Sequence, residues 1–107
     1  MNPIIDRIAI IIEEEVKKLD YVEALVYFGS YARKEHNFYS DLDAFIYLNT
    51  LEDNQKENRL KRMIRNVLIN DEEGISNEFE LYDKWVIFTE KTFIKLELSI
   101  KDINDAK

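Results

Sequence analysis

The sequence of 107 residues contains no cysteine, one proline and two glycines. Without cysteine, disulfide frameworks and thiolate zinc sites are excluded, and so few glycines and prolines exclude a linker-rich chain. No stretch approaches the roughly 20 consecutive apolar residues of a membrane-spanning helix. The apolar run from Ile8 to Ile12 is followed at once by three glutamates, and not by the small-residue cleavage site of a secretory signal. We therefore expect a soluble, cytoplasmic protein with no membrane contact.

Positive charge is also scarce. Fifteen Lys and Arg residues face 22 Asp and Glu residues, which gives a net charge of −7. A chain this acidic is poorly suited to binding duplex nucleic acid through its phosphates, although it can bind a nucleotide where divalent metal neutralises the phosphates. Hydrophobic residues make up 46% of the chain, enough for a buried core. The length predicts a single domain over residues 1–107.

Segments whose apolar residues recur at helical spacing alternate along the chain with segments that have the pattern of strands. Apolar residues recur at helical spacing over 3–19 and 53–69. Strands are predicted at 24–28, 42–48, 85–89 and 92–100, the first of them buried and the last two joined by a tight turn. Residues 77–83 fit a short helix or a strand, and 101–107 are expected to fray. This order predicts an α/β (α+β) fold, a mixed β-sheet with helices packed on it.

Residues 28–43 contain the residue pattern from which a reaction can be predicted. The first strand ends in Gly29-Ser30 and turns into a short helix, which Ser30 is expected to cap. A glycine there lets the backbone approach a phosphate without a Cβ clash, and backbone N–H groups with the Ser30 hydroxyl can donate to anionic oxygens. Asp41 and Asp43 stand at spacing i, i+2, so both carboxylates project from one face of the next strand.

Two neighbouring carboxylates repel each other, by about 1 kcal/mol at ~4 Å in water and about 4 kcal/mol at an effective dielectric of 20. The pair is therefore unfavourable unless a cation bridges it. Mg²⁺ is commonly held by one or two carboxylates together with substrate phosphates. A phosphate cradle beside such a pair predicts phosphoryl or nucleotidyl transfer. Taken singly, Gly29-Ser30 also fits an ordinary turn, and the two aspartates also fit a solvated strand edge.

The segment resembles the signature of the nucleotidyltransferase superfamily with the polymerase-β fold, in the version of minimal nucleotidyltransferases. The matching residues are Phe28, Gly29, Ser30, Ala32, Arg33, Ser40, Asp41 and Asp43. The sequence departs from the signature at Lys34, where the family usually has glycine. The resemblance implies a polymerase-β-type nucleotidyltransferase fold, with nucleotide binding by Gly29, Ser30, Arg33 and Ser40. Arg33 fits a surface charge as well as a phosphate contact.

The resemblance also implies a third carboxylate on a later strand. We assign it to Glu97, which alternates with core residues in the cleanest strand pattern of the chain. Glu80 and Asp83 are the alternatives, in the ambiguous segment. A plain exposed position on the sheet is the other interpretation of Glu97.

The activity that the resemblance implies is Mg²⁺-dependent transfer of a nucleoside monophosphate, AMP from ATP being expected, to an acceptor hydroxyl. Asp41, Asp43 and Glu97 would hold two Mg²⁺ ions. Stand-alone members of the family commonly act as antitoxins to a HEPN-type ribonuclease toxin, so we expect the acceptor on a HEPN-type partner or on another copy in a homo-oligomer. Two alternatives stay open: a non-catalytic module that neutralises a partner by contact, and the catalytic subunit of a two-component small-molecule nucleotidyltransferase.

Other polar and aromatic residues are expected to be structural. Arg59, Lys61, Arg62 and Arg65 lie on the second helix, where a solvated face is predicted and an acceptor or partner surface is the alternative. Trp85 is expected in the core, and not as a platform for base stacking.

Overall fold

Helices and strands form where the periodicity predicts them, in the residues that the computed structural model describes: 3–33, 41–49 and 54–106. The elements are α1 (Pro3–Val16), β1 (Val22–Phe28), α2 (Gly29–Ala32), β2 (Leu42–Leu48), α3 (Asn54–Asn70), β3 (Ile75–Leu81), β4 (Lys84–Thr89), β5 (Lys95–Asp102) and the 3-10 turn η1 (Ile103–Ala106). Within these ranges, no helix is long and apolar enough to span a membrane.

The five strands form one mixed sheet in the order β1-β2-β5-β4-β3. β2 and β5 are parallel neighbours, and the other neighbouring pairs are antiparallel. The predicted fold class, a mixed sheet with helices packed on it, is confirmed. The parallel pairing brings together two strands that α3 and the β3–β4 hairpin separate in the sequence.

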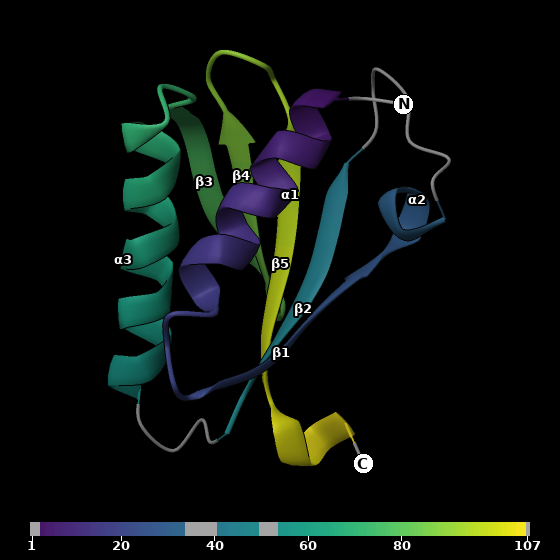
Figure 1. The fold of residues 1–107 in the computed structure, drawn as a ribbon, viewed down its shortest axis with the longest axis vertical. Coiled ribbons are helices and arrows are strands. Elements are labelled where there is room, and N and C mark those ends of the chain that lie inside the picture. Colours follow the sequence, from purple (N-terminus) through teal and green to yellow (C-terminus); the bar gives the residue numbers. More distant parts are fainter. Residues whose placement is uncertain (1–2, 34–40, 50–53, 107) are drawn as a thin grey trace.

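Helices α1 and α3 pack on the same face of the sheet (Figure 1). Their apolar stripes, with Ile8 and Ile12 from α1 and Ile64 and Leu68 from α3, are fully buried. Burying each such side chain contributes about 1.5–3 kcal/mol. Alternation along β2 directs Leu42, Ala44, Ile46 and Leu48 to these helices. The intervening side chains, Asp43 among them, therefore lie on the opposite face of the sheet.

Several predicted boundaries are wrong, although the elements exist. β1 is an edge strand and not a buried one: it has one neighbour, β2, and Val26 is 45% exposed. The first helix ends at Val16, three residues before the predicted end, because residues 17–20 turn the chain into β1. The second helix ends at Asn70, one residue later than predicted, and its predicted first residue, Asp53, lies outside the described residues.

The C-terminal third is more regular than predicted. Residues 75–81 form strand β3, which settles the ambiguous segment, and the turn between β4 and β5 spans residues 90–94 instead of two residues. Residues 101–102 do not fray, because they continue β5 along β2, where Asp102 is the register partner of Leu48. Residues 103–106 form the turn η1.

The basic residues of α3 do not form one solvated face. Lys61 is 9% exposed and pairs with Glu80, and the Arg65 Nε donates to Glu78 at 2.8 Å. Both cations lie over the Trp85 ring, at 5.7 Å and 5.1 Å from its centroid. Trp85 itself is 3% exposed, which confirms its place in the core. The prediction of solvation is thus wrong for the half of α3 that faces β3 and β4.

Candidate active site

The site lies on the sheet face opposite to α1 and α3, where the central strands begin. In the parallel pairing of β2 and β5, Asp43 is the register partner of Glu97. Register partners point to the same face, so the two carboxylates stand side by side. The antiparallel pairing of β1 with β2 brings Phe28, the last residue of β1, opposite Asp43. The strand end before Gly29 and both acidic strands therefore meet at one place.

Gly29 is required here by the position of Asp43. Its φ is +72°, a conformation that side chains disfavour, and a Cβ at this residue would lie 2.7 Å from the Asp43 Oδ2. The chain then makes the single turn of α2, closed by the Arg33 N–H, which donates to the Gly29 carbonyl oxygen at 3.2 Å. The expectation that Ser30 caps this turn is wrong. The cap residue is Phe28, and Ser30 is the second residue of the helix.

The surroundings of Asp43 disfavour the negative charge of its carboxylate. Burial, the hydrogen bond shared with Glu97 and the negative charges of Glu97 and Asp41 raise the pKa of Asp43 to about 6. Its Oδ1 is buried and has no hydrogen-bond partner among the described residues. A buried carboxylate oxygen without a donor is costly, and a cation at this atom would relieve that cost.

Two lysines partly neutralise the carboxylates. The Lys95 Nζ lies 2.9 Å from the Glu97 Oε1 and 3.7 Å from the Asp41 Oδ2, and the Lys84 Nζ lies 3.6 Å from the Glu97 Oε2. The hydrogen bond from Lys95 lowers the pKa of Glu97, and the same bond raises the pKa of Lys95. Sequence reasoning placed Lys95 on the face of Glu97 but missed this role. The i, i+2 spacing is its only signal, and Lys84 has none without the register of β4.

Two predicted alternatives, Glu80 and Asp83, are paired with lysines other than Lys84 and Lys95. Glu80 is on the edge strand β3, where it pairs with Lys61. Asp83 is 63% exposed in the β3–β4 turn and pairs with Lys101 at 2.9 Å. Arg33 is exposed at the end of α2. Ser40 lies outside the described residues.

Some features of the site favour a bound metal ion, and others show that the site is not already arranged for one. Within residues 3–33, 41–49 and 54–106, no three His, Cys, Asp or Glu side chains are already arranged to hold a metal ion. Lys95 stands between Asp41 and Glu97, which keeps these two carboxylates neutralised without metal. The unpartnered Oδ1 of Asp43 and its raised pKa are nevertheless the features that a divalent cation would relieve. The donor set, all carboxylate oxygen, suits Mg²⁺.

Comparison with known proteins identifies the family of the chain. The family model of the nucleotidyltransferase domain matches residues 9–104. The chain therefore belongs to the nucleotidyltransferase domain family. No curated protein matches the sequence.

A solved structure supports the fold assignment. The fold is similar to that of the Cid1 poly(U) polymerase in a crystal structure with MgGTP bound, with a TM-score of 0.52 and 15% identity. The similarity covers 92% of this chain and 30% of that one, so this chain spans about 30% of the length of the poly(U) polymerase structure.

Proposed function

We propose that this protein is a metal-dependent nucleotidyltransferase that transfers a nucleoside monophosphate, AMP from ATP, to an acceptor hydroxyl. The observation that carries the proposal is the pairing of Asp43 with Glu97 directly beside Gly29. The pKa of Asp43 stays raised although Lys84 and Lys95 compensate part of the charge, so the ionised pair is a cost to the fold. Membership of the nucleotidyltransferase domain family supports the reaction class.

In this proposal Asp41, Asp43 and Glu97 hold two Mg²⁺ ions. When bound, the metal neutralises the phosphates and polarises the phosphorus that is attacked. Lys95 contacts both Asp41 and Glu97, so it would compete with metal ions for these two carboxylates. The poly(U) polymerase of similar fold was crystallised with MgGTP bound, which supports proposing a nucleotide with a divalent metal as the ligand here.

The nucleotide is proposed to bind at the start of α2. The absence of a side chain at Gly29 lets the turn pack directly against the Asp43 carboxylate, which places the start of α2 beside the proposed metal ligands. Ser30, Arg33 and Ser40 are the proposed polar contacts to the nucleotide. The chain contributes chiefly positioning and charge compensation, the two effects that dominate phosphoryl transfer.

The acceptor is proposed to lie on a partner. The carboxylate pair lies on the sheet face that α1 and α3 leave uncovered, so a second protein can approach it. We propose that a HEPN-type protein, with this chain as its antitoxin, or a second copy of the chain supplies the hydroxyl. A cytoplasmic location is part of the same proposal.

A second candidate is a non-catalytic module of the same fold that neutralises its partner by contact. The observation that favours it is Lys95, which already compensates Asp41 and Glu97 without metal. The two candidates differ in one measurable respect. Only the first leaves a covalent nucleotide on the acceptor.

The test is mass spectrometry of the partner that co-purifies with this chain, after incubation with ATP and Mg²⁺. We expect the partner to gain the mass of one or more AMP groups, and the gain to disappear with EDTA or with Asp43→Asn. Glu80→Gln is the matched control, because its carboxylate pairs with Lys61 on the edge strand. Unmodified partner that stays bound and inactive in the presence of ATP and Mg²⁺ would favour the second candidate.

A further inference from the structure

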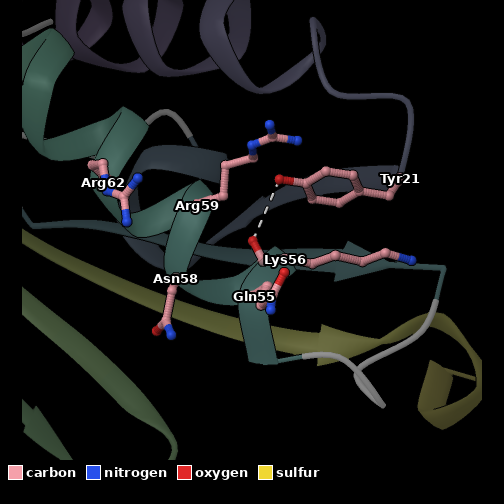
Figure 2. A pocket seen from close by; sticks show the side chains of 6 residues that line it. All are labelled: Tyr21, Gln55, Lys56, Asn58, Arg59 and Arg62. Carbon is pink, nitrogen blue, oxygen red and sulfur yellow. Dashed lines mark hydrogen bonds between the residues drawn. The ribbon is translucent and has the colours of Figure 1, made fainter.

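A hollow in the surface of the molecule lies away from the carboxylates. It has a volume of about 450 Å³ and is lined by Tyr21, Gln55, Lys56, Asn58, Arg59 and Arg62 (Figure 2). Tyr21 comes from the loop between α1 and β1, and the other five come from the first half of α3. We call it the α3 hollow.

The α3 hollow is at the far end of the sheet from the proposed active site. Tyr21 directly precedes β1, and the seven residues of β1 run from there to Gly29. At about 3.3 Å per residue, the hollow lies roughly 20 Å from Asp43. The register agrees, because Val22 pairs with Leu48 at one end of β2 and Phe28 pairs with Asp43 at the other. A ligand in the hollow therefore does not touch the carboxylates.

The lining is basic, although the whole chain has a net charge of −7. Three of the six lining residues are cations, two are amides and none is a carboxylate. Arg59 and Arg62 are exposed, and Arg62 forms no ion pair with any described residue. On the neighbouring stripe of the same helix, Lys61 and Arg65 are both held by glutamates. The positive charge of the hollow is therefore available to a ligand.

One wall of the hollow is held firmly in place. The Tyr21 side chain is 6% exposed, and its hydroxyl donates to the Lys56 carbonyl oxygen at 3.4 Å. The Lys56 ammonium lies over the Tyr21 ring, 5.6 Å from its centroid, and donates to the Asn49 Oδ1 at 3.1 Å. The positive charge of Arg59 also acts on the Tyr21 hydroxyl and lowers its pKa against the larger effect of burial. A wall fixed before binding lowers the entropy cost of taking up a ligand.

We propose that the α3 hollow binds a small anion that carries a chain of phosphates, as in inorganic tripolyphosphate or a nucleoside triphosphate. Guanidinium groups donate in a planar fork that matches phosphate oxygens, and the amide of Asn58 adds a neutral donor. The volume lies in the range of pockets for small ligands, which start at about 300 Å³. Binding uses the cations of the chain itself, so it needs no metal. This separates it from nucleotide binding at the carboxylates.

The experiment is a calorimetric titration of the full chain with sodium tripolyphosphate in EDTA at low salt. We expect Arg59→Gln and Arg62→Gln each to weaken binding roughly fivefold or more, which corresponds to about 1 kcal/mol. Lys91→Gln removes the same charge from an exposed turn residue whose only recorded pairing, among described residues, is 3.8 Å from Glu72. This control should bind like the wild type. An equal loss in all three variants, or no binding by the wild type, would overturn the proposal.

Two further measurements test the proposal without depending on whether the arginine variants fold or on the proposed function. In a ¹⁵N NMR titration of the wild type, the side-chain Nε resonances of Arg59 and Arg62 should shift with tripolyphosphate; shifts confined to residues around Asp43 would contradict the site. Asp43→Asn should leave tripolyphosphate binding in EDTA unchanged. ATP that binds as tightly as tripolyphosphate would assign recognition to the phosphates alone, and tighter binding would add the nucleoside.

Discussion

Replacing Asp43 by asparagine should stabilise the metal-free protein, and by an amount that depends on pH. The pKa of Asp43 is about 6 in the folded protein, against an ordinary value of 3.8, chiefly because of burial and of Glu97. Between these two values the folded state binds more protons than the unfolded state, so the free energy of unfolding falls as the pH rises. The cost is absent below pH 3.8 and fully present above about pH 6. Asparagine cannot ionise, so the variant lacks this cost.

The expected magnitude is about 1 kcal/mol. A rise in pKa of this size corresponds to at most about 3 kcal/mol for a carboxyl removed from solvent, but Asp43 is only half-buried, and screening by water reduces the effect severalfold. Asparagine has nearly the same shape and can still donate to Glu97. For a domain of about this size, 1 kcal/mol raises the Tm by about 4 °C.

Thermal unfolding in EDTA, followed by circular dichroism from pH 4 to pH 8, measures this gain. The Tm of Asp43→Asn should exceed that of the wild type by an amount that increases as the pH rises toward about 6 and is constant above it. Asp41→Asn is the control, since its side chain is 40% exposed and faces the Lys95 ammonium at 3.7 Å; it should bring no gain. The reasoning would be refuted if Asp43→Asn were less stable than the wild type at pH 8, or if the Tm difference did not change with pH.

Three further predictions concern residues around the same sheet. Gly29→Ala should destabilise the fold by about 2 kcal/mol or more in urea unfolding, because the backbone has a φ of +72° and the new Cβ would meet the Asp43 Oδ2; an unchanged midpoint would contradict this geometry. Glu97→Gln should abolish transfer at saturating Mg²⁺ while Glu80→Gln retains it, and the reverse outcome would remove Glu97 from the site. Tyr27→Phe should cost about 1 kcal/mol without affecting transfer, since it loses the 2.7 Å hydrogen bond to the Ala9 carbonyl oxygen.

The local elements were predictable because each depends on neighbours in the chain. The helical spacing of Ile5, Ile8 and Ile12 and the alternation of Leu96 and Leu98 are visible without any tertiary information. Element ends were less predictable. The chain leaves α1 at Val16 to reach β1, and β5 continues to Asp102 because β2 offers a parallel partner there. Such partners come from distant parts of the sequence, so local periodicity carries no signal for them.

The residue types of the candidate site were visible in the sequence, and their arrangement was not. The Gly-Ser and Asp-x-Asp spacing indicated the reaction class, and alternation made Glu97 the choice over Glu80. Only the parallel register of β2 and β5 brings Glu97 beside Asp43, and only that packing accounts for the raised pKa of Asp43 and the neutralising contacts of Lys95. Charge interactions fall with distance, and distances between residues far apart in the chain are decided by strand order.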